Sequence, residues 1–167
     1  MSDKSIPNPI TRRVVNFVHE HRQAYLETGG AKGHILDIRA SGGRSFATHC
    51  LIRYRGRKSG KTMITPLTYA DIAGEVAIVA SKGGADEHPS WYLNLTAADR
   101  IDFQIATQAF RATWREPEGA ERQKVWDFLV DCHPFYANYQ KRTDRRIPVV
   151  LMLGVEEIPV FQPGDIA

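Results

Sequence analysis

A serine, a lysine and two glycines directly after an apolar strand form the segment with the clearest chemical potential in this chain. The run Glu75–Ala80 has the β-branched character of a strand, and Ser81-Lys82-Gly83-Gly84 follows it at once. Glycine adopts positive φ readily, so consecutive backbone N–H groups here can converge on an anion. The lysine adds a point charge that suits phosphate or carboxylate. The segment therefore predicts a cofactor site.

A basic turn, Arg53–Lys61, is the second candidate for binding an anion. No acidic residue stands between Asp37 and Asp71, whereas seven arginines and lysines do. The two glycines of the turn are too close together for the motif G-x-x-x-x-G-K-[ST], which excludes a nucleoside triphosphatase of that kind. What remains is a turn that presents Arg57, Lys58 and Ser59 to an anion. A solvated basic hairpin and a contact with a nucleic-acid backbone are the alternatives.

Two pairs of aromatic residues could line a pocket. Tyr136 and Tyr139 are spaced i and i+3, so on a helix they share a face and offer phenolic hydrogens to a ligand. Trp91 and Tyr92 could stack on a cofactor ring. For both pairs, packing in the core with a polar tip outward explains the spacing equally well.

The remaining reactive residue types argue against a metal centre and against hydrolysis. The six histidines show no metal-ligand spacing with cysteine or acidic neighbours, so no zinc site is expected. The chain has no G-x-S-x-G motif. Cys50 lies in a strand pattern and Cys132 on the apolar face of a helix, and both are expected to be small buried hydrophobes.

Hydrophobic periodicity predicts the elements that position these groups. Apolar residues recur at helical spacing from Pro9 to about Glu27, which predicts an amphipathic helix packed on a barrel, with a peripheral membrane contact as the alternative. Ser45–Arg55 and Met63–Ala70 form a hairpin, and a strand at Val76–Ala80 extends it into an antiparallel meander. Further strands are expected at 101–105, 109–115 and 147–153, and further helices at 90–98, 117–132 and from Pro134.

Six or so short strands with helices at the edges predict a mainly β fold with flanking helices, of the α+β class, as a small barrel or rolled sheet. A chain of 167 residues is long enough for one domain with its own core. We expect an N-terminal amphipathic helix over 1–28, the barrel over 29–153 and a C-terminal surface extension over 154–167.

Composition places the chain among ordinary globular proteins. Hydrophobic residues make up 43% and charged residues 25%, and no apolar run approaches the length of a membrane span. The N-terminus lacks the apolar core of a secretory signal, and the two cysteines have no C-x-x-C spacing. These features favour a reducing, cytoplasmic setting.

Three blocks, in order, resemble the deazaflavin-dependent nitroreductase family over roughly Arg55 to Leu153. They are Gly56–Lys61 with Thr65-Pro66-Leu67, Ala80–Gly84 with His88-Pro89 and Trp91–Leu95, and Tyr139–Val150. The resemblance implies a split β-barrel of the FMN-binding-like type that binds the 8-hydroxy-5-deazaflavin coenzyme F-420. It also implies an oxidoreductase that passes hydride from the reduced coenzyme to a small electron-poor acceptor, such as a quinone, an activated enone or a nitro compound.

The resemblance also implies roles for individual residues. Arg57, Lys58 and Ser59 would hold the phosphate and polyglutamate tail of the cofactor. Members of the family often carry an arginine where Met63 stands, so Lys61 would compensate for the missing phosphate contact. The rest of the cofactor site would be Thr65, Pro66, Lys82, Gly83, Gly84, Trp91 and Asn94. The residues around the substrate would be Ser81, Tyr136 and Tyr139, which orient the electrophile and stabilise or protonate it as hydride arrives.

Two departures limit what the resemblance implies about the substrate. Thr68 and His133 stand where a tyrosine lines the pocket in nitroimidazole-reducing members. Other hypotheses remain beside the deazaflavin reductase: an FMN-dependent enzyme on the same barrel, a non-catalytic cofactor carrier and a nucleic-acid-binding module. A nucleic-acid partner is not expected, because Tyr54 is the one aromatic residue in the basic hairpin.

Overall fold

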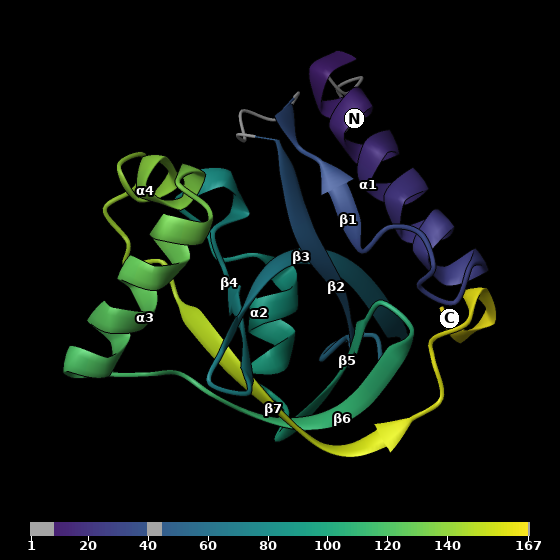
Figure 1. Ribbon diagram of the computed structural model, residues 1–167. Coiled ribbons are helices and arrows are strands. Elements are labelled where there is room, and N and C mark those ends of the chain that lie inside the picture. Colours follow the sequence, from purple (N-terminus) through teal and green to yellow (C-terminus); the bar gives the residue numbers. More distant parts are fainter. Residues whose placement is uncertain (1–8, 40–44, 167) are drawn as a thin grey trace.

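The computed structural model of the protein describes residues 9–39 and 45–166, with side chains from residue 17 onward in the first range. Residues 1–8 of the predicted N-terminal segment therefore lie outside the described residues. A seven-stranded antiparallel sheet has the order β1-β2-β3-β4-β7-β6-β5, and a pairing of β2 with β5 closes six of these strands into a barrel (Figure 1). The strands are β1 (Ile35–Asp37), β2 (Phe46–Arg55), β3 (Thr62–Ile72), β4 (Glu75–Val79), β5 (Arg100–Ile105), β6 (Gln108–Arg115) and β7 (Val149–Ile158).

Helices flank the barrel on two sides. In Figure 1, α1 lies beside β1 and β2, while α3 and α4 lie at the opposite edge. The helical elements are α1 (Pro9–Glu27), η2 (Lys82–Gly84), α2 (Ser90–Leu95), α3 (Gly119–Cys132), α4 (Phe135–Gln140) and η3 (Pro163–Asp165). The predicted mainly β fold with flanking helices is confirmed. Within the described residues, no helix is long and apolar enough to cross a membrane.

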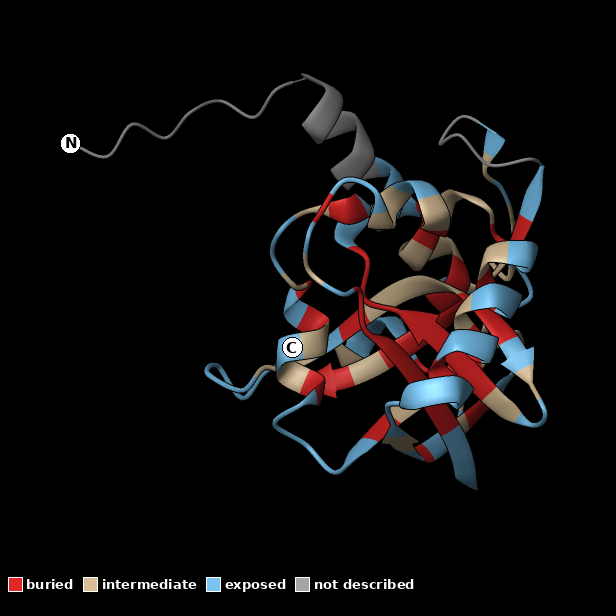
Figure 2. Ribbon diagram, turned by 90° about the vertical axis from the view of Figure 1, so that its left-hand side faces the viewer, coloured by how far each residue is buried: buried red, intermediate tan, exposed pale blue. Residues whose placement is uncertain are grey.

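Alternation along the strands divides the apolar residues into distinct clusters. Neighbouring side chains on a strand point to opposite faces, so Ile78 and Val150 fill the barrel while Ala77 and Leu151 face α3 and α4. A further cluster lies between α1 and the sheet and contains Tyr25. Figure 2 shows the buried residues concentrated in the strands. The barrel is thus filled with side chains, and a ligand site has to lie between the barrel and its helices.

Most described residues beyond Leu153 are exposed, but the last strand does not end at Leu153 as expected. Strand β7 continues to Ile158, and the Phe161 side chain is fully buried in the cluster beneath α1. The Phe161 backbone N–H donates to the side-chain oxygen of Gln104 at 2.7 Å, and the Arg53 guanidinium lies 4.4 Å from the Phe161 ring centroid. A single aromatic residue therefore anchors a segment whose prolines suggested an irregular surface tail.

The prediction that Cys132 is a small buried hydrophobe is also wrong, because Cys132 is exposed. The buried stripe of α3 consists of Arg122, Val125 and Leu129, and Cys132 continues their helical spacing but is the last residue of the helix and is not covered there. Arg122 occupies this stripe because its Nη2 donates to the Ile147 carbonyl oxygen at 2.6 Å. Cys50, by contrast, is buried as expected.

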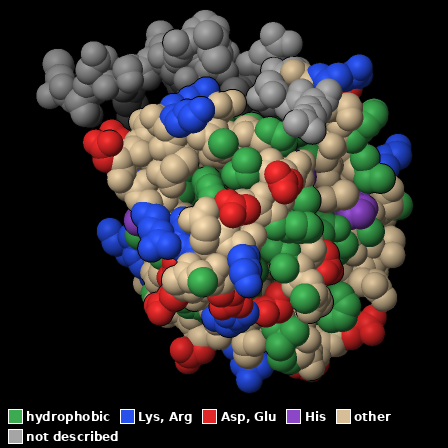
Figure 3. Space-filling model, turned by 60° about the vertical axis from the view of Figure 1, so that its left-hand side comes forward, with side chains coloured by type: hydrophobic (Ala, Val, Ile, Leu, Met, Phe, Trp, Pro, Cys, Tyr) green, Lys and Arg blue, Asp and Glu red, His purple; other side chains and the backbone are tan. Residues whose placement is uncertain are grey.

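Charged side chains of both signs are interspersed on the face of the molecule that Figure 3 shows. One example of such pairing is Arg115, which lies 2.8 Å from Glu75 and 2.6 Å from Glu121. The formal net charge of the chain is +3. On that face, positive charge is not gathered into the broad basic surface that is typical of nucleic-acid-binding proteins.

Candidate active site

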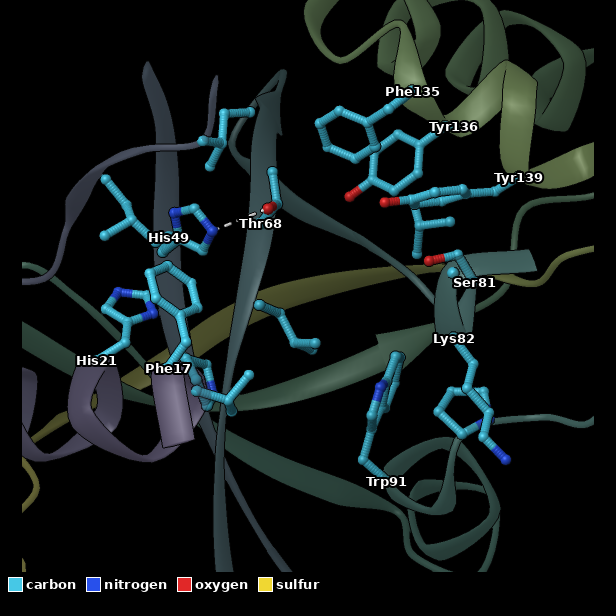
Figure 4. A pocket seen from close by; sticks show the side chains of 18 residues that line it. Phe17, His21, His49, Thr68, Ser81, Lys82, Trp91, Phe135, Tyr136 and Tyr139 are labelled. Atoms are coloured by element: carbon cyan, nitrogen blue, oxygen red, sulfur yellow. Dashed lines mark hydrogen bonds between the residues drawn. The ribbon is translucent and has the colours of Figure 1, made fainter. Parts of the chain in front are cut away.

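A cavity of about 350 Å³ lies between α1 and β1 on one side and η2 and α4 on the other (Figure 4). This volume falls within the range of small-molecule sites. The cavity brings together seven of the residues predicted from the sequence: Pro66, Ser81, Lys82, Gly83, Trp91, Tyr136 and Tyr139. They come from β3, η2, α2 and α4, so the closed barrel and its helices are needed to assemble them.

The η2 turn delivers the serine, lysine and glycines predicted from the sequence. Lys82, Gly83 and Gly84 all have positive φ, at 47°, 66° and 84°. A Cβ on Gly83 would meet no atom within 4 Å, whereas a Cβ on Gly84 would lie 2.5 Å from the Tyr139 carbonyl oxygen. Gly83 is therefore open to the cavity, and Gly84 instead allows α4 to pack against the turn. The Lys82 ammonium pairs with Glu87 at 2.9 Å.

Three hydroxyl groups on one side of the cavity point into it. Figure 4 shows those of Tyr136, Tyr139 and Ser81 directed toward the same space. Tyr136 is 4% exposed, and burial, followed by the neighbouring Tyr139, raises its pKa above the ordinary phenol value. Tyr136 is thus a neutral phenol at physiological pH. Among the described residues, neither Ser81 Oγ nor the Tyr139 hydroxyl has a hydrogen-bond partner.

Helix α2 places an aromatic ring at the edge of the cavity. Pro89 is buried and precedes the first helical residue, and Trp91 belongs both to the barrel core and to the cavity lining. Asn94, one turn later, does not line the cavity. Its Oδ1 accepts hydrogen bonds from the Arg57 backbone N–H and from Arg57 Nη1, both at 3.0 Å. Asn94 therefore joins the basic turn to the helix that carries Trp91.

The basic turn between β2 and β3 lies outside the cavity and is exposed. Arg57, Lys58, Ser59 and Lys61 are all on the surface, and the Lys61 backbone N–H donates to Ser59 Oγ at 3.2 Å. Strand β3 leads from this turn to the cavity at Pro66. Thr65 hydrogen-bonds to the Tyr54 hydroxyl at 2.9 Å and does not line the cavity. Apart from Thr65, Gly84 and Asn94, the predicted site residues thus fall into a cavity group and an exposed group at the basic turn, as a ligand with a ring and an anionic tail would require.

The sequence reasoning missed the opposite wall of the cavity, which α1, β1 and β2 build. His21 and His49 line it with their ring centroids 4.9 Å apart. Thr68, which the family resemblance had pointed to as a pocket position, lies opposite His49 in the β2–β3 register. The histidines were set aside for lack of metal-ligand spacing. A usable signal was present, because His21 stands four residues before the buried Tyr25 on the same helix face. His133, by contrast, is buried outside the cavity lining, with Nε2 3.1 Å from the Tyr69 carbonyl oxygen.

Burial controls the protonation of this wall. Burial, followed by the neighbouring His21, lowers the pKa of His49 to about 4. His49 is therefore neutral at physiological pH. Within the described residues, no group of three or more histidine, cysteine, aspartate or glutamate side chains is arranged to hold a metal ion.

Comparison with known proteins identifies the family of this chain. Residues 17–154 match the family described as F420H(2)-dependent quinone reductase. The chain belongs to this family. The chain is similar to the F420H(2)-dependent quinone reductase Rv1261c of Mycobacterium tuberculosis, with 32% identity over 141 residues, which cover 83% of this chain and 90% of the relative. The predicted class, a reductase that depends on coenzyme F-420, is confirmed.

Solved structures support the same assignment for the fold. A structure described as an F420-H2 dependent reductase, FDR-A, is 42% identical, with a TM-score of 0.58, and the match covers 62% of this chain and 92% of that chain. Another, described as a domain-swapped dimer, is 38% identical, with a TM-score of 0.61, and the match covers 83% and 98%. The predicted split-barrel fold of the quinone reductase family is confirmed.

Proposed function

We propose that this protein transfers a hydride from reduced coenzyme F-420 to a quinone-type acceptor held in the cavity. The observation that carries the proposal is the convergence of the Ser81, Tyr136 and Tyr139 hydroxyl groups beside the open turn at Lys82 and Gly83. Hydroxyl groups placed in a cavity can stabilise and protonate an oxygen on which negative charge develops. That is the chemistry a quinone carbonyl needs when it receives a hydride.

The described residues fit the coenzyme in two respects. Gly83 leaves open space in the η2 turn at the cavity, and the cations at Arg57, Lys58 and Lys61 are exposed for an anionic tail. Lys82, Gly83, Trp91 and the chain at Pro66 would hold the ring system, while Arg57, Lys58, Ser59 and Lys61 would hold the tail. When bound, the reduced cofactor supplies the hydride. The outer positions Thr65, Gly84 and Asn94 would shape the site through β3, α4 and the basic turn.

The residues on the acceptor side of the cavity would bind the quinone, orient it and protonate the oxygen that receives negative charge. Phe17, Leu67 and Trp91 contribute apolar surface that holds a flat ring and keeps water from the cavity. Ser81 Oγ and the Tyr139 hydroxyl donate hydrogen bonds to the acceptor's carbonyl oxygen. Tyr139 is partly exposed, so a proton it donates can be replaced from solvent. Activated enones and nitro compounds as acceptors, a cytoplasmic location and a membrane contact through α1 stay predictions from the sequence.

The test is a fluorescence titration of the full chain with oxidised coenzyme F-420, followed by turnover assays with the reduced coenzyme and a panel of quinones. We expect saturable binding and quinone-dependent oxidation of the reduced coenzyme. Tight binding of FMN with unchanged deazaflavin fluorescence would contradict the proposal. Binding of the deazaflavin without turnover of any quinone would instead indicate a cofactor carrier.

A further inference from the structure

The hydrogen-bond polarity of one cavity wall can be derived from a single histidine. His49 Nδ1 lies 3.1 Å from the Ala47 carbonyl oxygen, which can only accept a hydrogen bond. Nδ1 must therefore carry the ring proton. Because burial and the neighbouring His21 keep His49 neutral, Nε2 is left without a hydrogen and offers a lone pair.

Thr68 receives its orientation from this lone pair. Its Oγ1 lies 3.0 Å from His49 Nε2, so the single hydroxyl hydrogen of Thr68 is donated to the histidine (Figure 4). Thr68 also lines the cavity. The lone pairs of its oxygen thus remain available to other groups, and its hydrogen does not.

The hydroxyl groups on the η2 and α4 side of the cavity differ from that of Thr68. Those of Ser81 and Tyr139 have no hydrogen-bond partner among the described residues, so they can donate to a ligand.

We propose that the cavity has a hydrogen-bond-accepting group at Thr68, and that it selects quinones that carry a hydroxyl or amino donor beside the reacting ring. His49 is the positioning residue that sets this polarity through Thr68. The inference rests on the proposed function, since it takes the cavity to be the acceptor site. The preferred substrate is then a quinone whose carbonyl receives hydrogen bonds from Ser81 and Tyr139 while its substituent donates one to the opposite side.

The experiment compares 2-(hydroxymethyl)-1,4-naphthoquinone with 2-(methoxymethyl)-1,4-naphthoquinone, in which a methyl group replaces the donor hydrogen. Their dissociation constants are measured by calorimetry on the full chain without cofactor. We expect the hydroxymethyl compound to bind about fivefold more tightly, which is the ratio one neutral hydrogen bond typically gives. Equal binding of the two probes would overturn the inference and leave the proposed function standing. Failure of both probes to bind would count against the proposed acceptor site itself.

Two matched variants locate the preference at Thr68. Thr68→Ser keeps the hydroxyl and should keep the ratio near fivefold, whereas Thr68→Val removes the hydroxyl and should bring the ratio to about one. A Thr68→Val protein that still prefers the hydroxymethyl compound would overturn the inference. His49→Leu tests the positioning role, because the freed Thr68 hydroxyl can then donate and the ratio should fall to one or below. If His49→Leu does not fold, the Thr68 pair still decides the matter.

Discussion

The cavity and the basic turn are built in opposite ways. In the cavity, hydrogen bonds join His49 to Thr68 and to the Ala47 carbonyl oxygen, and Tyr136 is buried beside them. In the turn, Lys58 and Lys61 are exposed, and their charges lie in contact with solvent. Buried polar groups are strongly coupled to the fold, whereas exposed charges are screened by salt and by water. Changes in the cavity should therefore alter stability and turnover, and changes in the turn should alter cofactor affinity.

The largest effect should come from filling the close approach between η2 and α4. In Gly84→Ala, the new Cβ would lie 2.5 Å from the Tyr139 carbonyl oxygen at a φ of +84°. We expect the free energy of unfolding in urea to fall by about 4 kcal/mol, from left-handed strain plus overpacking. The control Gly83→Ala has the same backbone strain in open space and should cost about 1 kcal/mol. Equal losses would mean that α4 does not depend on this contact.

The second largest effect should be a loss of folding stability in acid, caused by protonation of His49. The pKa of His49 is lowered to about 4 in the fold, against about 6.5 when unfolded, so between these values the unfolded chain binds a proton that the folded chain does not. Stability should therefore fall as the pH drops from 6.5 to 4, by about 3 kcal/mol from this group, with no such loss above pH 6.5.

The control for this acid effect is His49→Gln, whose stability curve should be flatter over the same pH window. Burial also lowers the pKa values of His34 and His133, and these residues, like the neighbouring His21, are retained in the variant. The difference between the two curves thus isolates His49. Superimposable curves would contradict its burial as a neutral group.

The two tyrosines of α4 should separate by how far each side chain is exposed to solvent. Tyr139 is partly exposed, so solvent can replace a proton that it donates, and we expect Tyr139→Phe to lower kcat for quinone reduction about 100-fold, the lower end of what a general acid contributes. Tyr136 is only 4% exposed, so its proton is not replaced in this way, and Tyr136→Phe should lower kcat only about fivefold. Titration should give coenzyme F-420 affinities within about twofold of the unmodified protein for both variants, if only the acceptor side is affected. A larger loss of kcat from Tyr136→Phe than from Tyr139→Phe would make Tyr136 the proton donor.

The sequence was sufficient for one wall of the cavity and insufficient for the other. Ser81, Lys82 and Gly83 follow a strand directly, so local patterning located them together. His49 and Thr68 are brought opposite each other only by the β2–β3 register, and His21 joins them only because α1 packs on that edge. The burial of Phe161 could not be predicted for the same reason. Phe161 fills a space between α1 and the sheet, and no local sequence pattern indicates that space. Contacts between distant segments are set by tertiary packing, which periodicity does not encode.

The smallest effect is expected in the basic turn, where it tests the other half of the comparison. Because Lys58 is exposed, Lys58→Ala should weaken coenzyme F-420 binding only about threefold at low salt, as an exposed charge pair would. The loss should disappear at about 0.5 M salt, where the screening length is only a few ångströms. Lys124→Ala on α3 makes the same charge change away from the turn and should leave affinity unchanged. A loss of affinity that persists in high salt would show that Lys58 becomes buried against the cofactor. The turn in the complex would then resemble the cavity, where polar groups are buried and are not screened by salt.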